Sequence, residues 1–151
     1  VVALGASDGQ GLRVKGGRWV VAHAPASHVD DASWIAEYSA RVGAAMDTLT
    51  AGGATVVWLG VPNHPSSTTR ARLRVLDSVV RAEAGRRKDH VVYIDTWKLF
   101  NAPDGSYAKG IVDPGDATWK VVRAPDGFHL NRAGVRILAA VVASVVHAHL
   151  G

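Results

Sequence analysis

The sequence predicts an α/β protein in which a parallel sheet is covered by helices on both faces. Three short apolar runs, residues 1–5, 54–61 and 91–95, have the composition of strands that are buried on both sides. Segments with helical periodicity lie between these runs and after the last one. Because strands and helices alternate, the strands are expected to pair in parallel. Three strands are few for such a sheet, which has about five or six on average.

Composition is typical of one soluble globular domain spanning residues 1–151. Apolar residues make up 48% of the chain and charged residues 20%, with both signs mixed. Each apolar run is too short to cross a bilayer. The absence of cysteine excludes disulfides and thiolate metal sites. The net charge of +4 would suit an anionic partner, but much of the excess lies in residues 70–88.

The first apolar run leads into a polar, glycine-rich turn, residues 6–11. This turn follows the carboxyl end of a predicted strand, which is where open α/β sheets bind ligands. It contains three candidate site residues, Ser7, Asp8 and Gln10. Residues 12–29 are expected to form a loop with at most a brief strand near residues 19–22.

An amphipathic helix is predicted next, capped by Asp30 or Asp31 and ended by two glycines at 52–53. Its apolar positions follow steps of three and four residues: Ile35, Tyr38, Val42, Met46 and Leu49. The strand at 54–61 then ends in a loop that carries Pro62 and His64. Both residues are expected to border the cleft.

A second helix is predicted from Ser66 or Ser67 to Gly85, with Leu73, Leu76 and Val80 facing inward. Arg70, Arg74 and Arg81 share its outer face. They could bind phosphate, but solvated arginines are the commoner case, so no nucleic-acid partner is expected.

The last third of the chain combines an excursion with a long helix. Residues 101–122 contain two turn signals and are expected to form loops or a short hairpin. The helix at 132–149 is expected to bury six apolar side chains: Val135, Leu138, Ala139, Val142, Val145 and Val146.

Asp126 and His129 lie three residues apart just before that helix, with Asn131 as its predicted N-cap. A carboxylate that accepts the Nδ1 proton of a histidine leaves Nε2 free to deprotonate a hydroxyl nucleophile. Pro125 and Gly127 suit the turn that would bring the two groups together. An ordinary surface loop is the alternative, because Asp-x-x-His is a short pattern.

Four segments, in this order, resemble those of SGNH (GDSL-type) hydrolases, most closely a bacterial, envelope-associated branch: Gly5-Ala6-Ser7-Asp8-Gly9-Gln10, Trp58-Leu59-Gly60-Val61-Pro62, Tyr93-Ile94-Asp95-Thr96-Trp97 and Arg123-Ala124-Pro125-Asp126-Gly127-Phe128-His129. The resemblance covers essentially the whole chain. It implies a flavodoxin-like, three-layer α/β/α fold with Asp126 as the orienting acid and His129 as the base. Ser7 stands where that family has an oxyanion-hole Asn. Arg123, like the loop residues named above, is expected to contact substrate.

The chain departs from the family pattern because no Gly-Asp-Ser nucleophile segment precedes Gly5. The sequence therefore resembles the C-terminal portion of such a domain. A missing N-terminal segment, or a second chain, is expected to complete the sheet. Residues 1–5 are accordingly expected to be paired on both sides.

Ser7 also has a second interpretation, since Gly5-Ala6-Ser7-Asp8-Gly9 matches the Gly-x-Ser-x-Gly nucleophile elbow of α/β-hydrolases. That motif runs straight into a helix, whereas residues 10–17 contain three glycines and lack helical periodicity. The oxyanion position is therefore the preferred interpretation.

The resemblance implies an ester hydrolase or acyltransferase without cofactor or metal, acting on an acyl ester such as an O-acyl group of an envelope glycan. It favours a location in the cell envelope or outside the cell, with any membrane association provided by regions outside this chain. The alternatives are a catalytically inactive glycan-binding domain, an esterase with Ser7 as nucleophile, and a nucleic-acid-binding module that uses residues 70–88.

Overall fold

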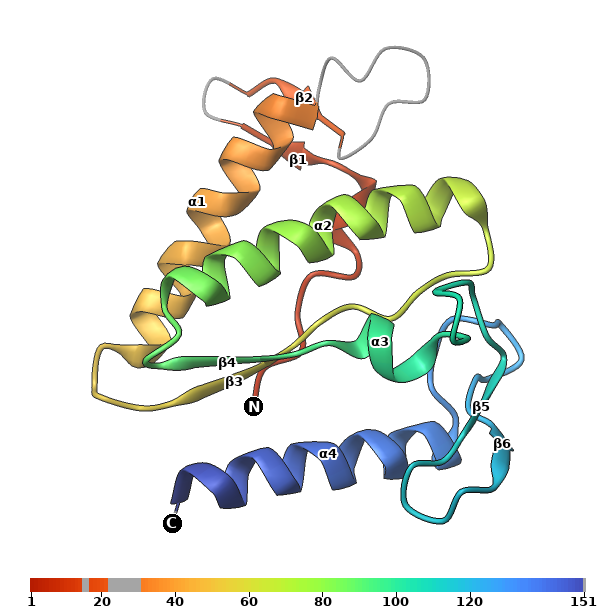
Figure 1. The fold of residues 1–151 in the computed structure, drawn as a ribbon. Coiled ribbons are helices and arrows are strands. Elements are labelled where there is room, and N and C mark those ends of the chain that lie inside the picture. The colour runs from red at the N-terminus through yellow and green to blue at the C-terminus, as the bar shows by residue number, and fades with distance from the viewer. Residues whose placement is uncertain (15–16, 22–30, 151) are drawn as a thin grey trace.

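The computed structural model describes residues 1–14, 17–21 and 31–150, which form a mixed α/β structure (Figure 1). Its elements are the 3-10 helix η1 (Asp8–Gln10), the strands β1 (Leu12–Arg13), β2 (Trp19–Val20), β3 (Val56–Leu59), β4 (Val91–Ile94), β5 (Gly110–Val112) and β6 (Trp119–Val121), and the helices α1 (Asp31–Thr50), α2 (Ser67–Arg86), α3 (Thr96–Phe100) and α4 (Arg132–Leu150). The predicted cap residue Asp30 lies outside the described residues. The three long helices were predicted from periodicity, whereas the short helix α3 was not.

The described strands form three two-stranded sheets. Strands β3 and β4 pair in parallel, with Val56 opposite Val91 and Leu59 opposite Ile94. The ribbons β1–β2 and β5–β6 are antiparallel. Helices α1 and α2 lie on one side of the β3–β4 pair and α4 on the other (Figure 1). The parallel pairing is thus confirmed, but two strands are too few for the expected flavodoxin-like sheet.

Residues 1–5 do not form the fully buried strand that their apolar character predicted. Val2 makes one parallel bridge with Trp58: its N–H donates to Val57 O and its carbonyl accepts from Leu59 N, both at 2.8 Å. Val1 is 70% exposed and Leu4 59% exposed. Among the described residues the stretch is therefore paired on one edge only. The prediction was wrong about burial because no described segment covers the other edge.

The main core lies between α1, α2 and β3. The buried stripe of α1 follows four-residue steps: Trp34, Tyr38, Val42 and Met46. Ile35 and Leu49, which were predicted to be on the same face, are 39% and 44% exposed because they lie at the edges of this stripe. Residues four apart on a helix lie almost above one another, so the buried stripe is narrow and leaves Ile35 and Leu49 partly outside it.

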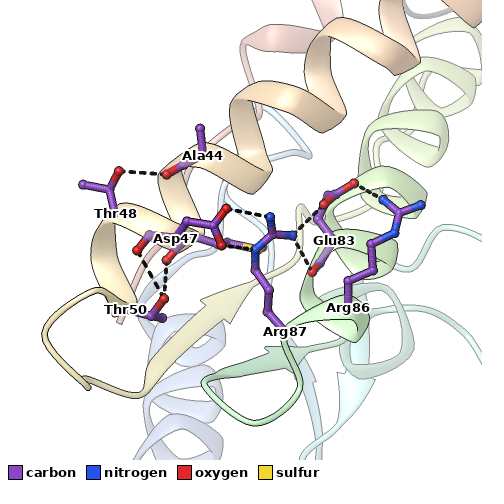
Figure 2. A network of polar contacts seen from close by, with 8 residues as sticks. Ala44, Asp47, Thr48, Thr50, Glu83, Arg86 and Arg87 are labelled. Atoms are coloured by element: carbon purple, nitrogen blue, oxygen red, sulfur yellow. Dashed lines mark hydrogen bonds and ion pairs between the residues drawn. The ribbon is translucent and has the colours of Figure 1, made fainter.

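An ion-pair network joins the C-terminal parts of α1 and α2 (Figure 2). The Arg87 guanidinium donates to both carboxylate oxygens of Asp47, at 2.6 and 2.9 Å, and to Glu83 Oε2 at 2.6 Å. Arg86 bonds the other oxygen of Glu83. Nearer the N-terminus of α2, Arg81 donates to Asp95 at 2.6 Å. Three of the seven basic residues at 70–88 are therefore neutralised by carboxylates within the chain, which weakens the nucleic-acid hypothesis.

Arg87→Ala is expected to lower the free energy of unfolding by about 1–3 kcal/mol. The main reason is Glu83, which is 5% exposed and would lose its bond to a well-placed cation. Lys88→Ala is the matched control, since Lys88 is exposed and should change stability by less than about 0.5 kcal/mol. Urea unfolding of both variants measures the difference. Equal stabilities would show that the network does not stabilise the α1–α2 junction.

Helix α4 begins as predicted, because Asn131 Oδ1 accepts from the backbone N–H groups of Ala133 and Gly134 at 2.9 and 3.1 Å. The prediction of its burial was wrong: none of the six side chains expected to be buried is fully buried, Val135 is 54% exposed, and the buried side chain is that of Ile137. By length and composition alone, residues 132–149 could cross a membrane, although the apolar runs of the sequence were predicted to be too short for this. In the structure, 11% of these residues are buried. The core helix of a soluble protein meets the same criteria of length and composition.

Candidate active site

The loop between β6 and α4 folds back on itself. Arg123 and Leu130 form an isolated antiparallel bridge, and Ala124 N donates to His129 O at 2.8 Å. Gly127 N donates to Ala124 O at 2.9 Å, and Gly127 has φ 75°, a left-handed conformation that glycine adopts readily. The loop thus closes by its own backbone hydrogen bonds and carries Asp126 and His129 at its tip.

Asp126 holds the imidazole and the backbone of His129 at the same time. The distance from His129 Nδ1 to Asp126 Oδ2 is 2.6 Å. The other carboxylate oxygen, Oδ1, accepts from Phe128 N at 2.9 Å and from His129 N at 3.0 Å. The histidine bond and these backbone bonds lower the pKa of Asp126 to about 2. The predicted pairing of these two side chains is therefore present in the structure.

This pairing determines which nitrogen of His129 can act as a base. With a pKa of about 2 the carboxylate is ionised at neutral pH and can only accept hydrogen bonds. Nδ1 must then carry the proton, so in neutral His129 the free lone pair is on Nε2. The His129 side chain is 75% exposed, so that lone pair is accessible. Within the described residues, no group of three or more His, Asp or Glu side chains could hold a metal ion.

Arg123 does not take the substrate-binding position predicted for it. The residue is 2% exposed, and its guanidinium donates to the carbonyls of Phe128 at 3.0 Å and Phe100 at 3.4 Å. Burial lowers its pKa. Its guanidinium also lies 5.7 Å from the rings of Phe100 and Tyr107. Arg123 therefore supports the loop that carries Asp126 and His129 from inside and is out of reach of a ligand in solution.

Gly127 packs against two side chains that support the loop from outside. Tyr107 donates its hydroxyl to Gly127 O at 2.6 Å. A Cβ at position 127 would lie 3.1 Å from that hydroxyl and 3.2 Å from Pro65 Cγ. The loop is thus fitted closely to its surroundings at this position.

Gly127→Ala is expected to reduce any activity of the site more than Gly105→Ala. Both glycines have similar positive φ values, 75° and 79°, so both substitutions carry a backbone cost of roughly 1 kcal/mol. Only position 127 has close neighbours, since nothing lies within 4 Å of a Cβ at position 105. Comparing turnover and thermal stability of the two variants separates loop displacement from backbone strain. Equal losses would contradict the role given to Tyr107 and Pro65.

A cavity of about 360 Å³ brings His129 together with two other predicted site residues, since Ser7, His64 and His129 all line it. The rings of His64 and Phe128 lie 5.3 Å apart. His64 Nδ1 accepts from Ser66 N at 3.0 Å, which fixes the orientation of the ring. The structure therefore gathers Ser7, His64 and His129 from three distant parts of the sequence.

Ser7 lacks the surroundings of a nucleophile elbow. Its backbone has φ −79° and ψ −19°, an ordinary right-handed conformation. The 3-10 helix η1 follows it, and then Gly11 and β1, so no α-helix begins there. Its hydroxyl does not cap η1. Because an elbow is a strained turn from a strand directly into a helix, the local geometry does not match a nucleophile elbow.

Ser7 also lines a second cavity of about 310 Å³, between residues 3–8 and 59–62. The predicted site residues Asp8 and Pro62 line this space and not the first cavity. Asp8 lies near Tyr38, whose pKa is raised by burial and then by the Asp8 carboxylate. The side chain of Gln10 lies outside the described part of the structure. Ser7 therefore lines two cavities: one contains His129, and the other lies beside the unpaired edge of residues 1–4.

Arg72 is a residue of this site that the sequence analysis did not identify. It lines the first cavity with Thr69, which precedes it by three residues on α2. The sequence predicted an inward face with Leu73 and an outer face with Arg70, and Arg72 lies on neither face. The signal available in the sequence was its place beside the inward-facing Leu73, in the second turn after a loop expected to border the cleft.

Comparison with models of protein families gives a match. The pattern that defines the family described as "Protein of unknown function (DUF459)" matches residues 1–145. The matched range includes the residues of both cavities and the Asp126–His129 pair. No curated protein matches the chain.

Proposed function

We propose that this chain, which belongs to the DUF459 family, is a serine ester hydrolase or acyltransferase of the SGNH type. The description of the family gives no activity, so the proposal is based on the site. The observation that carries this proposal is the 2.6 Å contact between Asp126 and His129 at the rim of a cavity. The contact supplies an oriented base with a free Nε2. The sequence resemblance to SGNH hydrolases supports the same assignment.

In the proposed mechanism His129 Nε2 takes the proton of a serine hydroxyl as that oxygen attacks the ester carbonyl. The resulting imidazolium is stabilised by the Asp126 carboxylate. Backbone N–H groups and the Ser7 hydroxyl donate to the oxyanion of the tetrahedral intermediate. The imidazolium then protonates the leaving alcohol. Water, or an acceptor hydroxyl in a transferase, finally releases the acyl group from the serine.

The nucleophilic serine is proposed to come from a segment that pairs with the free edge of residues 1–4, either an N-terminal segment or a second chain. The N–H and C=O groups of Val2 face β3, so those of Ala3 face the opposite side and can accept another strand. The second cavity begins at this edge and reaches Ser7. A serine carried by that strand would enter the site beside Ser7.

The proposed substrate is an acyl ester, such as an O-acyl group on an envelope glycan. Only the resemblance supports the glycan and a location in the cell envelope or outside the cell. The site supports the ester, because acyl transfer requires a base that activates a hydroxyl and a donor for the oxyanion, roles proposed here for His129 and Ser7.

Hydrolysis of p-nitrophenyl acetate by the full-length protein tests the proposal. We expect turnover above the buffer rate and its loss after treatment with a serine-directed phosphonate. Addition of a glycan acceptor would distinguish transfer from hydrolysis by the appearance of an acylated product. The absence of both turnover and phosphonate labelling would contradict the enzymatic assignment.

A catalytically inactive, glycan-binding domain is the second candidate. One observation favours it: within the described residues, no hydroxyl group makes a hydrogen bond with His129 Nε2. An acetylated glycan that binds the full-length protein in calorimetry and is recovered unchanged would support this candidate over the enzyme.

A further inference from the structure

We propose that the cavity selects substrates that carry a negative charge near the ester, and that Arg72 is the residue that recognises this charge. The inference rests on the proposed function, since it names the class of ester on which the site acts. It is carried by the position of Arg72, by its lack of an internal partner and by the polar character of the neighbouring wall.

Arg72 shares the cavity of about 360 Å³ with Ser7 and His129. Helix α2 brings it there from the second turn, next to Gly9 of the η1 segment: a Cβ added to Gly9 would lie 3.8 Å from Arg72 Cβ. The absence of a side chain at Gly9 therefore lets η1 approach α2 closely. A group held by Arg72 would share a cavity with the reacting centre.

Arg72 differs from the arginines at the C-terminal end of α2 in bonding no carboxylate of the described residues; Arg70 and Arg74 bond none either, but they do not line this cavity. Arg81, Arg86 and Arg87 each bond at least one Asp or Glu. Arg72 makes no hydrogen bond or ion pair with any residue that the structure describes, and its Nε is buried without a partner. A guanidinium has five N–H donors, and a buried donor without an acceptor is costly. The two Nη groups are not among the buried unpartnered atoms and carry four of these donors, so a bound anion could accept from them.

Two further features of the same wall suit an anion. The cavity lies near the N-terminal end of α2, where the helix dipole favours negative charge. Thr69 lines the cavity one turn before Arg72 and can donate a hydroxyl hydrogen bond. The planar fork of Arg72 fits either a carboxylate or a phosphate group, each of which accepts two parallel bonds. The recognised group is therefore an oxyanion on the acyl or the alcohol side of the ester.

The test compares two p-nitrophenyl esters of equal chain length, the hexanoate and the singly charged adipate monoester. In the full-length protein we expect kcat/KM for the adipate monoester to exceed that for the hexanoate by roughly 10- to 100-fold, the range of a charge-assisted hydrogen bond. Arg72→Gln should bring this ratio close to one. Arg70→Gln, on the same helix, should preserve it. Inhibition of the hexanoate reaction by inorganic phosphate, lost in Arg72→Gln, would assign the preference to phosphate esters as well.

A binding measurement separates this inference from the proposed function. Monomethyl adipate and methyl hexanoate are titrated while the ring protons of His64 and His129 are followed by NMR. Preference for the adipate that Arg72→Gln abolishes would support Arg72 as the recognition residue even if no ester were hydrolysed, and only the enzymatic assignment would then fail. Hydrolysis with no preference in either assay, or a preference that survives Arg72→Gln, would overturn the inference and leave the hydrolase assignment intact.

Discussion

His129→Ala is expected to lower kcat/KM for ester hydrolysis by roughly 10³- to 10⁶-fold in the full-length protein, because the serine loses the base that activates it. The side chain is 75% exposed, so its removal should leave the unfolding midpoint almost unchanged. His147→Ala on the exposed end of α4 is the control and should retain wild-type turnover. Activity and thermal unfolding are measured on the same preparations. Wild-type turnover by His129→Ala would exclude this mechanism.

Asp126→Asn tests the other half of the same pair, and we expect a loss of roughly 10²- to 10⁴-fold. An amide can donate to Nδ1, which would move the imidazole proton to Nε2 and remove the base. In the wild type the pKa of Asp126 is about 2, lowered first by its bond to His129. Protonation of Asp126 should therefore add no acidic limb to the pH–rate profile above about pH 4. Its contribution to stability is present above the unfolded-state pKa near 3.9 and is lost as pH falls through 2.

Ser7→Ala is expected to lower kcat by roughly 10- to 1,000-fold while a serine-directed phosphonate still labels the enzyme at another residue. The hydroxyl would donate to the oxyanion, so its loss weakens the transition state without removing the nucleophile. Ser144→Ala, at an exposed position of α4, is the control for serine substitution. Peptide mapping of the labelled protein gives the modified residue.

Labelling of Ser7 itself would assign it as the nucleophile and support the α/β-hydrolase-like alternative. The strand proposed beside residues 1–4 would then have no catalytic role. Ser7 has an unstrained backbone and is not followed by an α-helix, so we expect the label on another residue.

The features that were predicted well from sequence are those with local causes. The Asp126–His129 pair spans three residues, so its geometry depends on one turn. The Asn131 cap depends on two N–H groups in the next turn of helix. The β3–β4 pair follows from two apolar runs separated by a helix. Each of these could be inferred from a short window of sequence.

The features that were missed depend on packing between distant segments. Arg123 stood in a loop motif and was expected to contact substrate, but the carbonyls of Phe100 and Phe128 meet it in the interior. Arg72 reaches the cavity only because η1 packs on α2. The burial of α4 and of residues 1–5 depends on what covers their other sides. Periodicity gives the apolar face of an element but cannot tell whether a neighbour occupies it.

The self-contained closure of the 123–131 loop has a consequence for how such an enzyme could evolve. The hydrogen bonds that orient the imidazole arise inside one nine-residue segment, with Tyr107 as an outside brace. The acid and the base would therefore be inherited, grafted or lost as one unit, independently of the segment that supplies the nucleophile. A scaffold that lost its serine would keep an intact Asp126–His129 pair, and a later insertion could restore turnover without rebuilding it.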